Sequence, residues 1–317
     1  MVLYALKRLL SAIPTLFIII AVAFFMMRLA PGGPFTSERN VPPAIEANLN
    51  AKYNLDDPLP VQFFKYLGNV LQGDFGPSFV NRDFTVTELV LQGLPVSITI
   101  GLSALMLAIS VGSILGVIAA LRQNKATDYT VMTVAMAGIT IPNFVTAPVM
   151  TLIFAVWNDW LPTSGWIGWS GIEQQGLDAF FRSLILPVIT LALPQIAIIS
   201  RLMRGSMIEV LRSNFIRTAR AKGLSPGKIV TRHALRAAAL PLISYLGPAT
   251  AALLSGSLVI EKIFTLPGIG QYFVTGALNR DYTLVMGVVI IYATLIVVLN
   301  LLADLVLAAL DPKVRLT

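Results

Sequence analysis

The chain of 317 residues contains no cysteine and a single histidine, His233. Without cysteine there is no disulfide framework and no thiolate site. A zinc site or a serine–histidine catalytic system would have to be built around His233, and the sequence shows no cluster of partner residues there. Charged residues make up only 12% of the chain, whereas soluble domains carry about 25%. The scarcity of charge argues against a soluble protein.

Hydrophobic residues make up 56% of the chain, and the mean hydropathy is +0.78. The apolar runs are continuous for about 20 residues, the length that crosses a bilayer as a helix. A barrel would instead show strand-length alternation. We therefore predict an all-α integral membrane protein with six transmembrane helices, several of them kinked by proline. The predicted spans are Leu9–Ala30, Pro95–Leu121, Tyr129–Trp157, Ser183–Met203, Pro241–Phe264 and Leu284–Leu310.

Lysine and arginine are distributed unequally between the two sides of these spans. Fifteen of the 23 basic residues fall in the N-terminal stub, the second and fourth connections and the C-terminal tail. The positive-inside rule then places these segments, and both termini, in the cytoplasm. It puts Ser78 outside and Ser225 inside. Topology also accounts for the net charge of +7, so a lipid bilayer is the expected partner and nucleic acid is not.

The segment Pro31–Leu94 has the opposite charge balance, with seven acidic and four basic residues. We predict two short helices in it, at Pro42–Tyr53 and Leu59–Gln72, and a capping box formed by Thr85 and Glu88. The expected domains are therefore a retained N-terminal anchor helix (1–30), a small extracytoplasmic cap (31–94) and a five-helix core (95–317). Within the core, Gly112 and Gly116 form a GxxxG pattern that permits close helix packing.

Residues 201–240 contain nine lysines or arginines and cannot cross the bilayer. The pattern predicts a short helix from Asn214 that ends at Gly223, with Phe215 and Ala219 on one face and the arginines on another. This helix suits either an anionic lipid surface or a second protein. The stretch Gly223–Lys228 (GLSPGK) lacks the spacing of a phosphate loop, so no ATP site is expected there.

The stretch RTARAKGLSPGKIVTRHALRAAALP (217–241) resembles the EAA loop of ABC importer permeases in its peptide-transporter form. Arg217-Thr218-Ala219 stands at the Glu-Ala-Ala positions and Gly223 at the family glycine. His233-Ala234-Leu235 stands at Ile-x-Leu, and the proline is displaced to Pro241.

Three other stretches agree with this resemblance: FFMMRLAPGGPF (24–35), GDFGPS (73–78) and TLPGIGQYFVTGALNRDYTLVMG (265–287). The stretch RLAPGGPFTSERN (28–40) is similar to B-type membrane subunits of oligopeptide permeases. Permeases for dipeptides, nickel or murein peptides remain alternatives.

The resemblance implies the type I ABC importer permease fold in a bacterial inner membrane. It implies a second homologous permease, two cytoplasmic ATPase subunits and an extracytoplasmic peptide-binding protein as partners. It also implies that this chain is not an enzyme and holds no metal or cofactor, since ATP and Mg²⁺ bind to the ATPases. The residues expected to dock into the ATPase groove, with Ala219 facing it, are Phe215, Arg217, Thr218, Ala219, Arg220, Ala221, Lys222 and Gly223.

Two other classes of protein are weighed against this one. An ion-coupled secondary carrier would need ionisable groups within the membrane. Asp304 is the one clear candidate within a predicted span, and a capping or interhelical bond is expected for it. An intramembrane hydrolase would need His233. Polar residues expected to line a substrate pathway are Asn143, Gln195 and Asn300, chosen because they are polar groups within spans.

Overall fold

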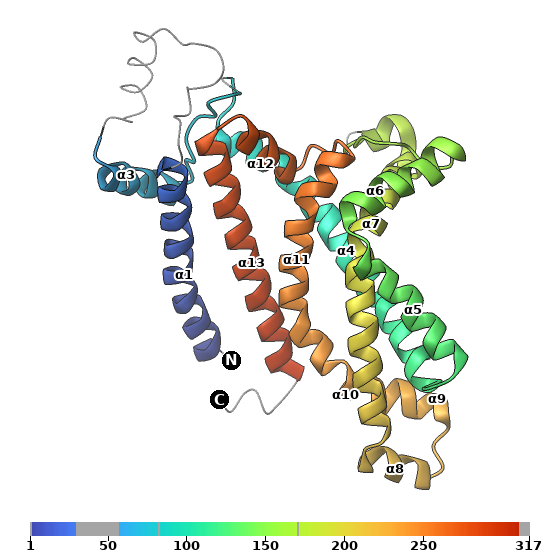
Figure 1. The fold of residues 1–317 in the computed structure, drawn as a ribbon. Coiled ribbons are helices and arrows are strands. Elements are labelled where there is room, and N and C mark those ends of the chain that lie inside the picture. Colours follow the sequence, from blue (N-terminus) through green and yellow to red (C-terminus); the bar gives the residue numbers. More distant parts are fainter. Residues whose placement is uncertain (1, 30–56, 82, 170, 311–317) are drawn as a thin grey trace.

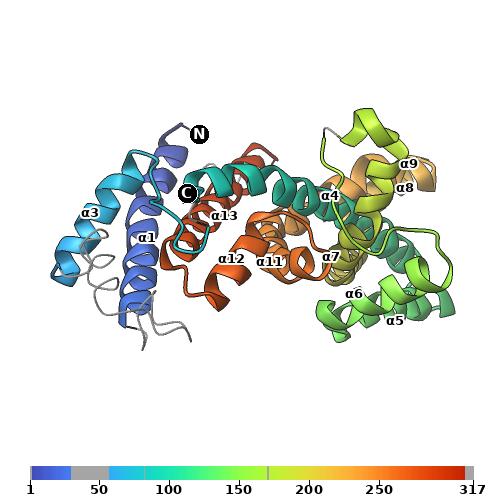
Figure 2. The same ribbon diagram turned by 90° about the horizontal axis from the view of Figure 1, so that it is seen from above.

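The computed structural model describes residues 2–29, 57–81, 83–169 and 171–310. These ranges are almost entirely helical, and their only strand-like pairing is an isolated bridge between Pro77 and Thr85. The chain forms a row of helices of which α1 lies at one edge and α5 and α6 at the other (Figure 1). The view from above shows α11 and α13 between those edges (Figure 2).

Within the described residues, five helices are long and apolar enough to cross a membrane. They are α1 (Val2–Leu29), α4 (Val86–Leu121), α7 (Gly171–Leu211), α11 (Leu240–Ile263) and α13 (Tyr282–Leu310).

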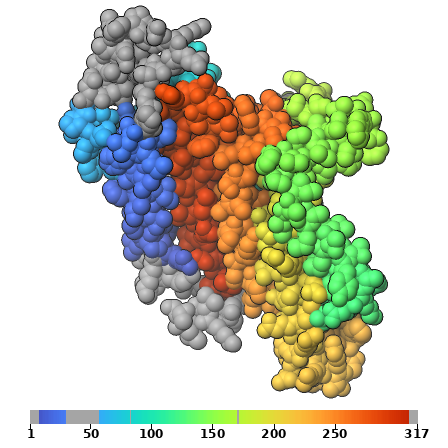
Figure 3. Space-filling model, in the orientation of Figure 1, coloured from blue at the N-terminus to red at the C-terminus, as the bar shows by residue number. Residues whose placement is uncertain are grey.

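The remaining predicted span, Tyr129–Trp157, is broken into two parts. Helix α5 (Ala126–Thr140) and the stretch formed by α6 (Asn143–Thr151) and a π-helical turn, η1 (Leu152–Trp157), meet at 104°. Ile141 is extended, with φ −95° and ψ 119°, because a residue that precedes proline is disfavoured in the helical region. Counted as one bent span, this pair completes the six predicted crossings, and Figure 3 shows it in green, projecting from the bundle.

Helix α7 is longer than the predicted span Ser183–Met203. It continues to Leu211, so the first part of the basic segment (201–240) is helical and continuous with the span. Beyond it follow α8 (Asn214–Ala221), α9 (Pro226–Lys228), the π-helical turn η2 (Ile229–Ala234) and α10 (Leu235–Ala238). The basic segment is therefore a chain of short helices between α7 and α11.

The GxxxG pattern of α4 lies directly against α7. A Cβ atom placed on Gly112 would lie 2.8 Å from the side chain of Ile199, and one on Gly116 would lie 2.6 Å from the carbonyl oxygen of Ser200. Any side chain at these positions would push the two backbones apart, so the close helix approach predicted from the sequence is confirmed.

The outer segment joins the bundle through apolar and polar contacts. Helix α3 (Leu59–Leu71) confirms the second predicted helix, and its buried Phe63 packs against the aromatic rings of α1. The capping box of Thr85 and Glu88 is also confirmed, with both reciprocal hydrogen bonds present. Helix α4 begins directly after it, ahead of the predicted start at Pro95. The first predicted helix, Pro42–Tyr53, lies outside the described residues.

A buried carboxylate ties this outer segment to α13. Asp281 accepts hydrogen bonds from Ser78 Oγ (2.5 Å) and from the backbone N–H of Val80 (3.2 Å). Its other oxygen accepts the N–H of Leu284 (3.2 Å) and so caps the start of α13. Ser78 is only 2% exposed as a result, which makes it unsuitable as a reporter of the outer surface.

Helix α1 begins, and α13 ends, at the end of the bundle where α8 lies (Figure 1). Because the chain has no native cysteine, single cysteines report on this topology cleanly. Asp83→Cys, at an exposed position that the predicted topology places outside, should react with a membrane-impermeant thiol reagent added to intact cells. Ser225→Cys, also exposed, should react only after the membrane is permeabilised. Labelling of position 225 from outside would contradict the topology.

Candidate functional site

Helix α8 ends in a backbone motif that needs glycine. Gly223 has φ +76°, its N–H donates to the carbonyl of Arg220 (2.9 Å), and the N–H of Leu224 donates to the carbonyl of Ala219 (3.3 Å). These two bonds form a Schellman motif, which satisfies carbonyls that a helix end otherwise leaves without partners. The predicted helix and its stop at glycine are both confirmed.

The buried face of α8 differs from the predicted one. Ile216 is fully buried and Ala219 is 7% exposed, and both belong to the apolar core that also contains Ile229 and Ala234 of η2. Phe215, predicted to share the face of Ala219, is 48% exposed. The apolar stripe runs at the i, i+3 spacing from Ile216 to Ala219, so the expectation that Ala219 faces a partner protein is wrong.

The opposite face of α8 is open. Helical geometry places Arg217, Thr218 and Ala221 away from the buried stripe, and all three are exposed. Phe215, Arg220 and Lys222 flank them and are exposed as well. This surface, which we call the α8 tip face, presents cationic side chains around the small side chain of Ala221. Figure 1 shows α8 at one end of the bundle.

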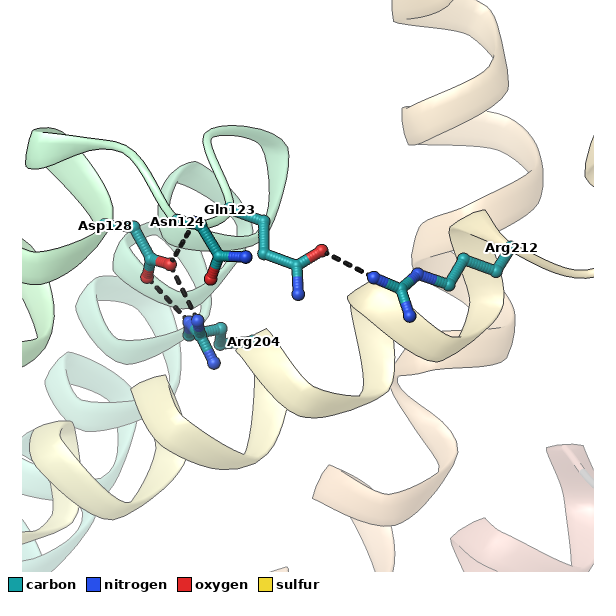
Figure 4. A network of polar contacts seen from close by, with 5 residues as sticks. All are labelled: Gln123, Asn124, Asp128, Arg204 and Arg212. Carbon is teal, nitrogen blue, oxygen red and sulfur yellow. Dashed lines mark hydrogen bonds and ion pairs between the residues drawn. The ribbon is translucent and has the colours of Figure 1, made fainter.

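A network missed in the sequence ties the base of α7 to α5 (Figure 4). Arg204 donates two hydrogen bonds of 2.6 Å to the carboxylate of Asp128, and the backbone N–H of Asn124 donates a third, of 2.9 Å. Arg212 donates to the side-chain oxygen of Gln123 (3.0 Å). The sequence does contain one indication of this ion pair: Asp128 is an acidic residue that directly follows the connection with Arg122 and Lys125.

The three predicted pathway residues each lie against α11. Gln195 accepts a hydrogen bond from the hydroxyl of Tyr245 (2.9 Å), and Asn300 packs against Gly247. The amide nitrogen of Asn143 lies 3.8 Å from a Cβ atom placed on Gly256, and its buried oxygen accepts no hydrogen bond from the residues described.

The contacts of Gln195 and Asn300 lie two residues apart on α11, at Tyr245 and Gly247, whereas that of Asn143 lies nine residues further on, at Gly256. Interhelical packing accounts for Gln195 and Asn300, and a pathway role for the three residues stays a prediction.

The acidic side chains within the spans have structural partners. Asp304 on α13 forms an ion pair of 3.0 Å with Arg8 on α1, the interhelical bond that was expected. Glu261, overlooked in the sequence, is fully buried near the end of α11. Its carboxylate accepts the N–H groups of Gly270 (2.8 Å) and Gln271 (3.3 Å) at the start of α12 (Ile269–Leu278), where a negative charge suits the helix dipole.

Nothing in the described part of the chain resembles a reaction centre. His233 is exposed on η2, and the residues described include no group of three or more metal-ligating side chains. A helical bundle of this kind, with an exposed basic helix projecting from one end, defines a polytopic membrane protein, the class to which transport subunits belong.

Comparison with known families identifies the kind of transport subunit. The chain belongs to the binding-protein-dependent transport system inner membrane components, whose family model matches residues 112–316. The model of the N-terminal part of such components matches residues 1–101. The protein is therefore a multi-pass inner membrane permease of the ABC transport type.

Individual relatives align along nearly the whole chain. The oligopeptide transport system permease protein OppB of Salmonella typhimurium is 52% identical over 312 residues, which are 98% of this chain and 99% of the relative. OppB of Haemophilus influenzae is 52% identical over 309 residues, 98% of each chain. The dipeptide transport system permease protein DppB of Bacillus subtilis is 42% identical over 313 residues, 99% of this chain and 98% of the relative.

The glycine at the end of α8 provides a direct test of the local structure. Gly223→Val forces a β-branched residue into the left-handed region, a strain of about 1–3 kcal/mol, and should expose residues 212–236 to trypsin in inside-out membrane vesicles. Gly227→Val is the matched control, because Gly227 lies in α9 without a positive φ and with open space around it. Equal cleavage rates for the two variants would contradict the role of Gly223.

Proposed function

We propose that this chain is one of two membrane subunits of an importer that carries oligopeptides into the cytoplasm. The observation that carries the proposal is the 52% identity, over nearly the full length, to oligopeptide permease subunits. Identity to the dipeptide permease subunit of Bacillus subtilis is lower, at 42%, so dipeptides are the second candidate substrate. Nickel and murein peptides stay more distant alternatives.

The proposed assembly contains a second homologous permease, two cytoplasmic ATPase subunits that bind ATP and Mg²⁺, and an extracytoplasmic peptide-binding protein. Support comes from the family, whose members are components of binding-protein-dependent systems. In this assembly the basic end of the bundle, with both termini, faces the cytoplasm and α3 and α12 face the binding protein. The alternative of an ion-coupled carrier loses its candidate groups, because Asp304 and Glu261 are engaged in interhelical and capping contacts.

The α8 tip face is proposed to enter a groove of the ATPase. It is exposed, and it sits on a helix whose other face is fixed to the chain's own core through Ile216 and Ala219. A helix held in this way transmits a push from the ATPase, because its buried face cannot slip on the segment that carries it. A helix that only rests on lipid headgroups would instead depend on its charges.

Substrate class is tested by peptide uptake in a strain that lacks this chain. Restoring the gene should restore uptake of peptides of three or more residues, with dipeptides taken up less well. Uptake should stop when the ATPase subunits are deleted, and it should persist when an uncoupler collapses the proton gradient. Uptake restricted to dipeptides would favour the second candidate, and sensitivity to the uncoupler alone would favour a carrier.

Docking of the α8 tip face is tested by how much ATPase co-purifies with the permease in detergent. Ala221→Trp places a bulky side chain at the centre of the exposed face and should abolish co-purification while leaving membrane insertion intact. Arg220→Ala removes a flanking charge and should weaken the free energy of ATPase binding by only about 0–1 kcal/mol. If the helix only lay on lipid, the ATPase would be retained by both variants, and Arg220→Ala would have the larger effect on membrane contact.

Ala219→Asp is the matched control for burial. It places an unpaired charge in the core beside Ile216, at a cost of several kcal/mol, and should therefore unfold the basic segment itself. The trypsin assay separates the two mechanisms: Ala219→Asp should be cleaved rapidly, whereas Ala221→Trp should be as resistant as the unmodified chain.

A further inference from the structure

Helix α5 is attached to α7 at two points, one near each end. Near the end of α5, a Cβ atom placed on Gly138 would lie 2.8 Å from the carbonyl oxygen of Leu193, so the two backbones are in contact. At its start, Asp128 is joined to Arg204 of α7 by two hydrogen bonds of 2.6 Å. With both ends held, α5 cannot turn or slide on α7 unless one attachment breaks.

The attachment at Asp128 is built to fix orientation. Asp128 is 1% exposed and Arg204 28%, and a planar guanidinium that meets both oxygens of a carboxylate fixes angle as well as distance. By contrast, the ion pair of Asp178 and Arg182, elsewhere on α7, joins two exposed side chains of one helix and cannot hold a second helix.

The same end of α7 carries the other contacts of the basic segment. Gly116 of α4 packs against the carbonyl of Ser200, one turn before Arg204. Arg212, two residues before α8, holds Gln123 in the connection between α4 and α5. These contacts join the lower parts of α4, α5 and α7 (Figure 4). Helix α8 shares an apolar core with this end of α7, in which Ile216 and Ala219 lie with Met203 and Met207. We refer to these four parts together as one body.

The first break in the helical path beyond this body is the bend at Ile141–Pro142. Helix α5 ends at Thr140 and α6 leaves at 104°. Proline supplies no N–H for a helical bond across the bend, so rotation there breaks fewer hydrogen bonds than rotation within α5. A displacement of α8 that reaches Thr140 unchanged therefore changes the angle between α5 and α6 at this bend.

We propose that Asp128 and Arg204 are positioning residues for coupling: they make α5 move with α8, so that a push on α8 is converted into a change of angle between α5 and α6. This inference rests on the proposed function, since it takes an ATPase as the source of the push. It adds the route by which the push reaches the membrane-embedded half of the chain.

The first test is the number of peptides imported per ATP hydrolysed by the complete transporter in proteoliposomes. Asp128→Asn keeps the size of the side chain and removes the charge. We expect basal ATP hydrolysis to be retained and peptides per ATP to fall about tenfold, a typical size for coupling between two sites. A merely structural defect would lower the rate of ATP hydrolysis and the rate of peptide import together, and the number of peptides per ATP would stay the same. Arg182→Gln, which breaks the exposed pair on the same helix, should leave the ratio unchanged.

Should Asp128→Asn fail to assemble, Arg204→Lys replaces it, because lysine keeps the charge but cannot form the two-bond fork. Arg204→Lys should also lower the number of peptides imported per ATP, by a smaller factor than Asp128→Asn. An unchanged ratio in whichever variant assembles would overturn the inference. If the unmodified complex itself showed no peptide import linked to ATP, the proposed function would fail instead, so the two failures are distinguishable.

The second test measures distances between spin labels, using the absence of cysteine in this chain and cysteine-free partner subunits. Labels at the exposed positions Thr130 on α5 and Asn214 at the start of α8, outside the α8 tip face, should keep one distance with and without ATP. Labels at Thr130 and Phe144, which lie across the bend, should change distance. In Asp128→Asn the distance between Thr130 and Asn214 should broaden and vary with ATP. A distance between Thr130 and Asn214 that already varies in the unmodified chain would overturn the inference.

Discussion

The close approach of α4 and α5 to α7 is the contact on which the rest of the bundle depends. It exists because Gly112, Gly116 and Gly138 present no side chain where the backbones meet. Between helices in lipid, burial of apolar surface supplies little drive, and close van der Waals packing takes its place. Helix α7 thereby becomes the axis to which two neighbouring helices and the whole basic segment are attached.

Polar groups are placed so that each spans a junction between helices. Asp128 joins α5 to α7, Asp304 joins α13 to α1, and Glu261 joins α11 to α12. An unpaired charge in these surroundings costs several kcal/mol, so each pair specifies one arrangement of the helices that it joins. These three acidic side chains therefore hold pairs of helices together.

The basic segment combines two requirements on one short helix. Ile216 and Ala219 fix α8 to the chain's own core, while Arg217, Thr218 and Ala221 remain open on the other side. Because its buried face is held in the core, α8 moves together with the end of α7. Its exposed face remains available to a partner protein. The left-handed turn at Gly223, with φ +76°, then ends α8, and α9, η2 and α10 lead the chain back to α11.

The sequence by itself determined the membrane class, the positions of the spans, the short helix from Asn214 and its stop at Gly223. These follow from apolar run length, charge placement and the conformational freedom of glycine, all of which are local properties. Only the tertiary structure decided that Ala219 faces inward, that Ser78 is buried beneath Asp281, and that Asp128 holds Arg204. The burial of Ala219 depends on how the chain folds back through η2, which begins at Ile229. The other two depend on partners far along the chain, 76 residues away for Asp128 and Arg204 and 203 for Ser78 and Asp281. Local pattern carries no information about which segment will arrive at such a position.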